Sequence, residues 1–246
     1  MTSSSSQAFK KIIFKAHELL VTDNSPESAI DLLKTYIENN EKDNVAINHW
    51  LGLCYLENEN YDKAKEAYLT IRGFYQAGFC ELLKGNHKEA VLLWDKCTDS
   101  EVRYWSQCLK TICMGKIDIE PTFLNIRNHL EADFGYLLRS GQEQFVNNIL
   151  KLVDYFVNIN LETYKFIGRA LLHNGFENSS VGYLLKGQKL LPNDPEIYYH
   201  LGQYSQQAGA YKEALSMYKH CLLISPTYSP ANDRLKEMKR NNQIIH

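Results

Sequence analysis

Residues 195–228 read PEIYYHLGQYSQQAGAYKEALSMYKHCLLISPTY, and the 34 residues before them, 161–194, read LETYKFIGRALLHNGFENSSVGYLLKGQKLLPND. Several residues of the first segment recur in the second at a constant spacing of 34. The recurring pairs are Tyr164 with Tyr198, Gly168 with Gly202, Gly175 with Gly209, and Pro192 with Pro226. Four matches in one register indicate a duplicated structural unit.

Within each unit an aromatic residue and an apolar-Gly pair come first, followed by a Gly, a small residue and a Pro. In the second unit these are Tyr198, Leu201-Gly202, Gly209, Ala214 and Pro226. The pattern resembles the tetratricopeptide repeat, a 34-residue helix–turn–helix unit. The resemblance implies an all-α fold, a right-handed α-solenoid of helix–turn–helix repeats with a C-terminal capping helix.

The residues of the pattern predict how the two helices of a unit meet. We expect Gly202 to let the second helix cross the first closely, with Ala214 as the small residue on the opposite side, because any Cβ at Gly202 would hold the axes apart. Gly209 is expected to end the first helix as a C-terminal cap with positive φ, as is Gly175 in the preceding unit. Pro226 follows the second helix, since proline cannot continue it.

Two dipeptides mark helix starts. Asp194-Pro195 and Ser229-Pro230 each combine an N-cap residue with a proline suited to the first helical position. The second dipeptide predicts a final helix over roughly 229–243, which closes the stack.

Weaker copies of the pattern extend toward the N-terminus, most clearly over 45–70. The predicted organisation is a disordered N-terminal tail over 1–9, repeats of this type over 10–100, degenerate or shortened helical repeats over 101–160, two 34-residue repeats over 161–228, and a capping helix and tail over 229–246.

The spacing between repeats changes in the first half, where Ala64 and the equivalent Ala90 are 26 residues apart rather than 34. Either the helices are shorter and joined directly, so that the solenoid continues, or 71–126 is an irregular insert between two short arrays. We favour continuity because Gly78 and Gly85 keep the offsets found within a repeat.

The composition, with 44% apolar and 23% charged residues, is ordinary for a soluble folded protein. The 27 Lys and Arg against 29 Asp and Glu argue against a dedicated nucleic-acid binder, whose phosphate contacts need a basic surface. No apolar run reaches the roughly 18–20 residues that span a bilayer, so direct membrane insertion is not expected. The first residues resemble no signal peptide. We therefore expect a cytoplasmic protein.

The sequence offers no catalytic residue, metal site or cofactor motif. Cys54 and Cys80 occupy the same position in their repeats, as do Cys97 and Cys221, which is typical of small packing residues. Neither a zincin motif, a phosphate-binding loop nor a nucleophile elbow is present. We expect a protein that is not an enzyme and needs no cofactor.

In a stacked array of helix pairs, the first helices line a concave surface that binds partners. The helical period places positions 2, 5, 9 and 12 of each unit on that surface. The candidate partner-binding residues are His49, Leu53, Tyr75, Phe79, Trp105, Leu109, Lys165, Arg169, Tyr199 and Gln203. The predicted groove is apolar and aromatic in its N-terminal half and polar, partly cationic, in its C-terminal half.

The apolar half is expected to bind an amphipathic helix or an extended segment of a partner. The alternative is that its side chains face other helices of the same chain. Lys165 and Arg169, one turn apart, are expected to hold an acidic residue or a C-terminal carboxylate. Their alternative is a solvated face paired with Glu162.

Some tetratricopeptide domains grip the C-terminal carboxylate of chaperones with Lys, Asn and Arg residues on consecutive first helices. The corresponding residues here would be Phe14, Glu18, Trp50, Arg72 and Gln76. Only Arg72 has suitable charge, so docking of chaperones by that carboxylate clamp is not expected.

The resemblance implies a non-catalytic protein–protein interaction module, a scaffold or adaptor that binds a peptide segment or helix of a protein partner in its groove. One alternative is a structural subunit of a larger assembly that uses its convex or terminal surfaces. Another is the regulatory part of an enzyme system.

Overall fold

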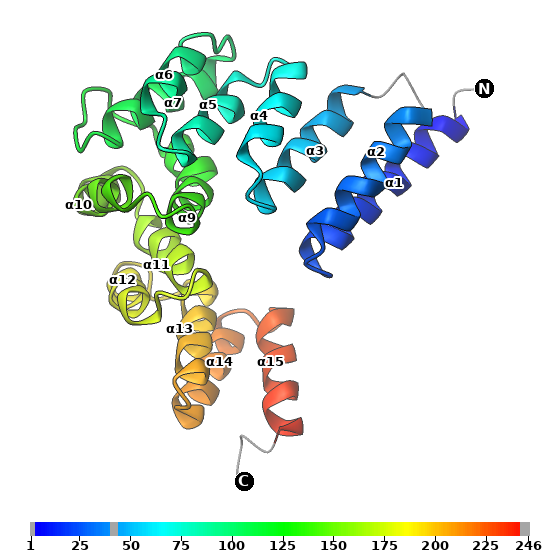
Figure 1. Cartoon of the computed structure of the whole chain (residues 1–246). Coiled ribbons are helices and arrows are strands. Elements are labelled where there is room, and N and C mark those ends of the chain that lie inside the picture. The colour runs from blue at the N-terminus through cyan, green and yellow to red at the C-terminus, as the bar shows by residue number, and fades with distance from the viewer. Residues whose placement is uncertain (1–2, 40–43, 242–246) are drawn as a thin grey trace. The chain divides into compact units, whose positions relative to one another are not determined.

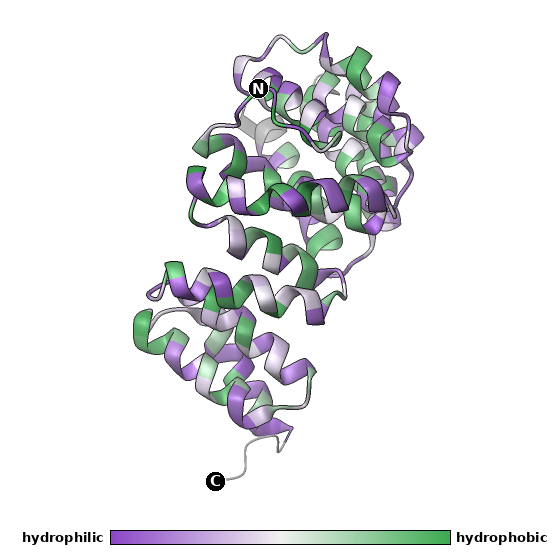
Figure 2. Cartoon of the chain, turned by 90° about the vertical axis from the view of Figure 1, so that its left-hand side faces the viewer, coloured by the Kyte–Doolittle hydropathy of each residue, from purple (hydrophilic) through white to green (hydrophobic). Residues whose placement is uncertain are grey.

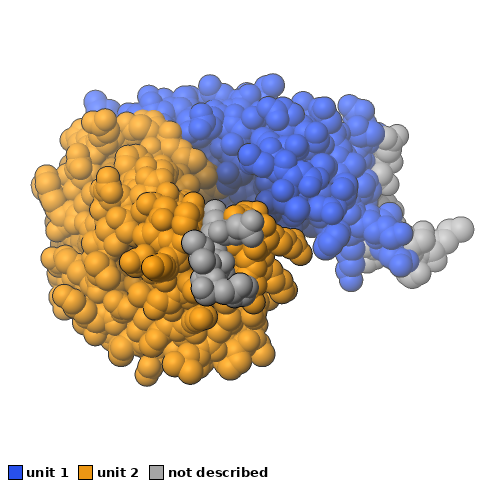
Figure 3. Space-filling view, turned by 90° about the horizontal axis from the view of Figure 1, so that it is seen from below, with its two compact units in different colours: residues 1–110 blue, residues 111–246 orange. Residues whose placement is uncertain are grey.

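Figure 1 shows the computed structural model of the chain, which describes residues 3–39 and 44–241. The described residues form helices joined by turns and loops, with no strand among them, which confirms the predicted all-α class. They separate into two compact units, unit 1 over residues 1–110 and unit 2 over residues 111–246 (Figure 3).

Unit 1 is a stack of antiparallel helix pairs. Its helices are α1 (Ser3–Val21), α2 (Pro26–Asn39), α3 (Asn44–Glu57), α4 (Tyr61–Thr70), α5 (Phe74–Leu83), α6 (His87–Trp94) and α7 (Ser100–Ile112), the last of which runs two residues past the unit boundary. Each odd-numbered helix from α1 to α5 packs against the next, while α2 contacts α3 and α4 contacts α5. The pairs therefore follow one another directly.

The short spacing in unit 1 comes from short helices. α4 and α5 have 10 residues each and α6 has 8. Because α4 packs on α5, the segment after Thr70 is not an irregular insert. The 26 residues between Ala64 and Ala90 thus reflect shortened helices joined by tight turns.

The predicted disordered tail over 1–9 is wrong for residues 3–9, because α1 already begins at Ser3. Phe9 explains part of the difference, since its ring packs 6.5 Å from that of Tyr36 on α2, between centroids. That contact ties the first turns of α1 to the neighbouring helix and favours helical backbone there. Residues 1–2 lie outside the described residues.

Unit 2 begins with a loop after α7 and then continues as helix pairs. Its helices are α8 (Phe123–Asn125), the π-helical turn η2 (Ile126–Leu130), α9 (Glu131–Arg139), α10 (Glu143–Ile159), α11 (Thr163–His173), α12 (Glu177–Leu190), α13 (Pro195–Gln207), α14 (Tyr211–Ile224) and α15 (Ser229–Arg240). The pairs are α9 with α10, α11 with α12 and α13 with α14, and α11 also packs on α9.

The last pair of unit 2 is covered by α15, as the predicted capping helix requires. Ala231 and Met238 of α15 are fully buried against Tyr198, Tyr218 and Cys221. The helix begins at Ser229 with Tyr228 as its N-cap, so the predicted capping role of Ser229 is displaced by one residue. Residues 242–246 of the predicted tail lie outside the described part of the chain.

Close helix crossing depends on glycine, as the sequence pattern predicts. A Cβ at Gly202 would lie 2.6 Å from the ring of Tyr218, and one at Gly78 would lie 2.5 Å from the ring of Trp94. No side chain larger than hydrogen fits at these crossings unless the rings shift. The predicted caps also hold, since Gly175 and Gly209 have φ of 80° and 73°.

The helices are amphipathic, with hydrophilic and hydrophobic residues interleaved along them (Figure 2). Over residues 3–39 and 44–241, no helix has both the length and the hydropathy to cross a membrane. The buried apolar residues instead lie between the helices of each unit.

Candidate functional site

The predicted groove residues of α5 and α7 lie in the core of unit 1. Tyr75, Phe79, Trp105 and Leu109 are all buried. The Nε1–H of Trp105 donates to the hydroxyl of Tyr75 at 3.0 Å, and the rings of Tyr75 and Phe79 stack with centroids 6.2 Å apart. The expectation that these four line an open groove is therefore wrong, because α5 and α7 cover each other's aromatic side chains.

The two predicted residues of α3 stay accessible. His49 is exposed, and its ring meets the edge of Tyr68 at 5.9 Å between centroids, while Leu53 is half-buried. The structure thus separates the apolar half of the predicted groove into a buried part on α5 and α7 and a surface part on α3.

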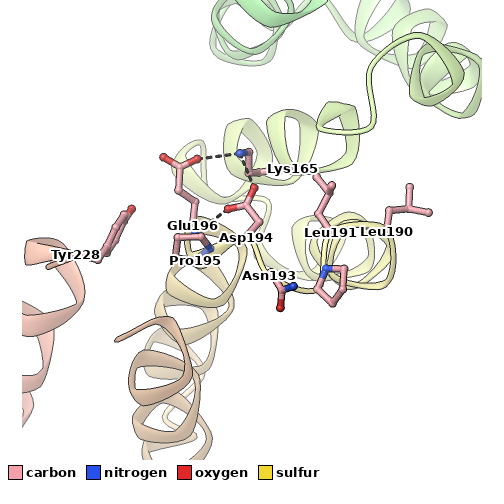
Figure 4. Close-up of a pocket in the computed structure, with 9 residues that line it drawn as sticks. Lys165, Leu190, Leu191, Asn193, Asp194, Pro195, Glu196 and Tyr228 are labelled. Carbon is pink, nitrogen blue, oxygen red and sulfur yellow. Dashed lines mark hydrogen bonds and ion pairs between the residues drawn. The ribbon is translucent and has the colours of Figure 1, made fainter. Parts of the chain in front are cut away.

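Lys165 of α11 is buried, and its ammonium group is surrounded by carboxylates of the same chain (Figure 4). Its Nζ lies 2.7 Å from Asp194, 2.9 Å from Glu162 and 3.0 Å from Glu196. Burial by itself lowers the pKa of Lys165, but the hydrogen bonds to Asp194, Glu162 and Glu196 outweigh it and raise the pKa above the ordinary value. Lys165 is therefore a charged, internally paired group.

Arg169, one turn further along α11, is also paired within unit 2. Its Nε lies 3.1 Å from Glu131 of α9, and its Nη1 lies 3.2 Å from Glu196 of α13. Burial raises the pKa of Glu131, although the charge of Arg169 acts in the opposite direction. Arg169 thus links three consecutive first helices through carboxylates of the chain itself.

The charge balance of this site reverses the sequence expectation. Two cations, Lys165 and Arg169, meet the four carboxylates Glu131, Glu162, Asp194 and Glu196, which leaves a formal charge of 2 − 4 = −2. The expected role of the two cations in holding a partner's carboxylate is therefore wrong, since both are already neutralised. The pairing with Glu162 is present, but Lys165 is buried rather than solvated.

The repeat register builds the acidic side of the site. Asp194 caps α13 by accepting a hydrogen bond from the backbone N–H of Glu196 at 2.9 Å, while its other oxygen binds Lys165. One repeat earlier, Asn160 accepts from the backbone N–H of Glu162 at the same 2.9 Å. Because each pair is 34 residues from its counterpart, the duplicated cap places both glutamates beside α11.

Tyr199 and Gln203 of α13 belong to an aromatic cluster. The ring centroid of Tyr199 lies 5.4 Å from that of Tyr228 and 5.1 Å from that of His200. Gln203 is hydrogen-bonded to Nδ1 of His200 at 2.7 Å. Burial lowers the pKa of His200 to about 3, helped by the charge of Arg169, so this histidine is neutral near pH 7.

A cleft of about 710 Å³ opens beside the charged group, as Figure 4 shows. It is lined by Lys165, Leu190, Leu191, Pro192, Asn193, Asp194, Pro195, Glu196 and Tyr228. The end of α12 gives it an apolar wall, the starts of α11 and α13 give it charge, and Tyr228 stands at another side. We call this site the unit 2 cleft.

Sequence reasoning overlooked most of the unit 2 cleft. Of the lining residues it selected Lys165 from the helical period but passed over Asp194 and Tyr228, which lie in the loops between helices. The signal was present in the register, since Asn160, Asp194 and Tyr228 follow one another at intervals of 34. Asp194 and Tyr228 lie just before α13 and α15 and both line the cleft, while Asn160 lies shortly before α11.

Metal ligands and cysteine thiols are the remaining groups to consider in the described residues. Across residues 3–39 and 44–241, no group of three or more His, Cys, Asp or Glu side chains is arranged to hold a metal ion. All six cysteines are free and buried. Burial raises the pKa of Cys54 to about 11 and that of Cys80 to about 12, which keeps both as thiols.

Comparison with known proteins identifies two of the repeats. A family model described as "Tetratricopeptide repeat" matches residues 45–70 and 195–228, which are α3–α4 and α13–α14. Among curated proteins no match was found.

Two solved structures are similar to the chain at low identity. The P58(IPK) TPR domain is 15% identical, with a TM-score of 0.35, over 95% of this chain and 65% of that one. Yeast Tom70 is 14% identical, with a TM-score of 0.34, over 98% of this chain and 67% of that one. The chain thus spans about two thirds of the length of each.

Proposed function

We propose that this chain, a tetratricopeptide-repeat protein, acts as a non-catalytic adaptor that binds a short segment of a protein partner in the unit 2 cleft. The repeats support a role in protein–protein interaction in general. The observation that carries the finer proposal is the cleft itself, in which an apolar wall adjoins Lys165, Asp194 and Glu196, with a formal charge of 1 − 2 = −1, and Glu162 binds the same ammonium group from beside the cleft.

The charge of the cleft favours a basic partner segment. The side chains of Glu162 and Glu196 remain 33% and 36% exposed, so both accept further hydrogen bonds from an incoming ammonium or guanidinium group. The side chain of Lys165 is only 5% exposed, and its ammonium group is paired with the same carboxylates, so its repulsion of an incoming cation is weak. The cleft therefore favours a lysine or arginine of the partner over an aspartate or glutamate.

The rest of the cleft suits an apolar residue next to that basic one. Leu190, Leu191 and Pro192 supply apolar lining to the cleft. Figure 4 shows the ring of Tyr228 on the side of the cleft away from Leu190 and Leu191. A guanidinium or ammonium group close to a tyrosine ring gains cation–π attraction. The partner segment is therefore one in which Lys or Arg adjoins an aliphatic residue.

The affinity of such a segment is modest. A short peptide that buries one basic and one apolar side chain has a Kd on the order of micromolar, about −8 kcal/mol. Because the attraction involves partly exposed charges, the affinity falls as salt concentration rises.

An array of 12-residue peptides with varied charge and hydropathy, probed with the full chain, tests the proposal. We expect peptides with Lys or Arg beside Leu or Ile to bind, and acidic peptides not to bind. For a labelled peptide selected in this way, Glu196→Gln and Tyr228→Ala should each weaken binding about tenfold in fluorescence anisotropy.

Two matched variants serve as controls for that measurement. Glu213 and Tyr211 are exposed residues at the start of α14 and do not line the cleft. Glu213→Gln and Tyr211→Ala should leave the affinity unchanged. Preferential binding of acidic peptides, or equal losses in the control variants, contradicts the proposal. The cytoplasmic location and the absence of a nucleic-acid partner stay predictions.

A further inference from the structure

A second cavity of unit 2, of about 380 Å³, lies at the turns between helices, and we call it the turn pocket. It is lined by the last turns of α9 and α11, the first turns of α10 and α12, and the two loops that join these helix pairs. None of the residues predicted to line the partner groove lines it. Its apolar lining consists of Leu137, Leu138, Val146, Leu150, Leu171 and Phe176.

The turn pocket is separate from the unit 2 cleft. Ser179 lines the pocket near the start of α12, whereas Leu190 lines the cleft at the end of the same helix. Because these residues are eleven positions apart, the two sites are separated by roughly 16 Å along the axis of α12. A small ligand in one site therefore leaves the other open.

A glycine at the turn between α9 and α10 leaves part of the pocket unfilled. Gly141 lines the pocket and has a φ of 69°, a conformation that favours glycine over other residues. A Cβ atom at Gly141 would have no neighbouring atom within 4 Å. The turn thus contributes backbone but no side chain, and the space beside it stays accessible.

The aromatic residue Phe176 departs from the pattern of the other repeats. It is the N-cap of α12, and its side chain makes no capping hydrogen bond. Polar or small residues occupy the same position before α4, α6, α10 and α14, namely Asn60, Asn86, Gln142 and Ala210. The ring of Phe176 is 45% exposed and lines the turn pocket. Residues that break a local preference such as capping are typical of functional sites.

The size of the turn pocket suits a single small molecule. An apolar cavity of about 150 Å³ holds one benzene molecule, and small-molecule sites begin at about 300 Å³. The turn pocket therefore has room for a bicyclic aromatic ring with a short side chain. Leu137 and Leu171 are buried and give the ring an apolar environment, while the exposed ring of Phe176 offers an aromatic contact.

The charge of the turn pocket favours a cationic ligand. Among the described residues that line it, Glu143 is the one with a charge, and it is exposed in the first turn of α10. Arg139 lies outside the lining, with its guanidinium group 4.5 Å from the ring centroid of Tyr136. The exposed Ser179 adds a hydrogen-bonding group. An ammonium group is therefore attracted to this site more strongly than a carboxylate.

We infer that the turn pocket binds a free small molecule that joins an aromatic ring to an amine, of about the size of tryptamine. The ring lies among the apolar side chains beside Phe176, and the ammonium group pairs with Glu143. This inference does not depend on the proposed function, because the turn pocket and the unit 2 cleft share no lining residue.

Three fluorinated probes with the same ring test the inference in fluorine NMR titrations of the full chain. They are 5-fluorotryptamine as the cation, 5-fluoroindole as the neutral molecule and 5-fluoroindole-3-acetate as the anion. We expect the cation to bind most tightly and the anion at least tenfold more weakly than the cation.

The variant Glu143→Gln separates the effect of charge from that of shape. It should bind 5-fluorotryptamine several-fold more weakly and should leave the affinity for 5-fluoroindole unchanged. Glu213→Gln is the matched control, because Glu213 is exposed in the first turn of α14 and does not line the pocket. Glu196→Gln, which tests the unit 2 cleft, should also leave both affinities unchanged.

Filling the pocket gives a second test. Ser179→Trp from α12 and Asn147→Trp from α10 each place a large side chain at an exposed lining position, and each should weaken all three probes at least tenfold. Gln144→Trp, at an exposed position of α10 outside the lining, should leave the affinities unchanged. Circular dichroism identical to that of the parent shows that the variants fold, and two filling variants guard against the failure of one.

Several outcomes overturn the inference. One is equal affinity for the cation and the anion, and another is the same loss in Gln144→Trp as in Ser179→Trp. Loss of 5-fluorotryptamine binding in Glu196→Gln would place the amine in the unit 2 cleft. Binding of a peptide that contains Trp-Lys, without binding of the free amine, would assign the turn pocket to a protein partner.

Discussion

The fifth residue of a repeat has different surroundings in the two units. In unit 1 it is Tyr75, whose ring stacks on Phe79 and whose hydroxyl accepts a hydrogen bond from Trp105. In unit 2 it is Lys165, which is bound by three carboxylates. Both are buried at the same helical position. The helical period therefore determines which side of the helix a residue occupies, while the adjacent elements determine what covers that side.

The elements that cover the two positions differ between the units. The helices α4, α5 and α6 have 10, 10 and 8 residues, and their apolar side is closed by an aromatic side chain of α7. In unit 2, α12, α13 and α14 have 14, 13 and 14 residues, and the loop before α13 brings Asp194 against Lys165. The seam between α5 and α7 in unit 1 is thus apolar, and the seam between α11 and α13 in unit 2 is charged.

The largest expected effect comes from removing the buried cation of unit 2. Lys165→Met leaves Asp194, Glu162 and Glu196 without their shared partner, and we expect a loss of about 4 kcal/mol in the free energy of unfolding. All three tryptophans lie in unit 1, so circular dichroism should show an earlier urea transition while tryptophan fluorescence changes little.

The matched control for this prediction is Lys186→Met. Lys186 is exposed and pairs with Asp154 at 3.4 Å, so its removal should cost less than about 0.5 kcal/mol. Equal losses for the two variants would show that the carboxylates around Lys165 are as well solvated as Asp154.

Close helix crossings should be equally sensitive in both units. Gly78→Ala in unit 1 and Gly202→Ala in unit 2 place a methyl group 2.5 Å and 2.6 Å from the rings of Trp94 and Tyr218. Each should lower stability by about 3 kcal/mol, the first in tryptophan fluorescence and the second in circular dichroism. At Gly182, an exposed helical position with no neighbouring atom, the same change should stabilise the chain by about 0.5 kcal/mol. A loss at Gly182 matching the other two would refute the steric explanation.

Acid should weaken unit 2 through His200. The pKa of His200 is about 3 in the folded chain, chiefly because of burial, and about 6.5 when unfolded. Below pH 6.5 the unfolded chain binds the proton first, so stability falls by about 1.4 kcal/mol per pH unit until about pH 3. At pH 5 the loss is about 2 kcal/mol.

The measurement is the urea midpoint by circular dichroism at pH 7, 6 and 5. His200→Gln should flatten the dependence, whereas His220→Gln, at an exposed position of α14, should leave it as steep as in the parent chain. An unchanged slope in His200→Gln would place the acid sensitivity elsewhere.

The smallest effect is expected in the apolar seam of unit 1. Tyr75→Phe removes the hydroxyl that accepts from Nε1 of Trp105 and should cost about 1 kcal/mol, with a shift in tryptophan emission. Tyr211→Phe, at an exposed site in unit 2, should have no effect on either quantity. If the emission of Tyr75→Phe matches that of the parent, this hydrogen bond does not persist in solution.

The sequence predicts the local structure of this chain better than its surfaces. Gly202, Gly209 and Asp194 behave as their positions in the repeat require, because each role depends only on neighbouring backbone or on one crossing helix. The exposure of Trp105 could not be predicted in the same way, since it depends on contacts with α5, 30 residues away.

The charges of the unit 2 cleft illustrate the same limit. Lys165 and Arg169 lie on the expected face of α11, but Glu131 and Asp194 reach them from residues 38 before and 29 after. The net charge of a site is the sum of contributions from several helices. The residues of α11 alone predict a cationic site, whereas the carboxylates that other elements bring to it make the formal charge negative. The 34-residue spacing of Asn160, Asp194 and Tyr228 was the usable signal.

The double attachment of Asp194 has a consequence for molecular recognition. One of its oxygens holds the first turn of α13, and the other holds α11, so the loop between the two repeats is tethered at both sides. A ligand that enters there meets a preorganised wall and loses little free energy to ordering it. Such a rigid host discriminates between ligands by shape and charge, because it does not reshape itself to accommodate a poor fit.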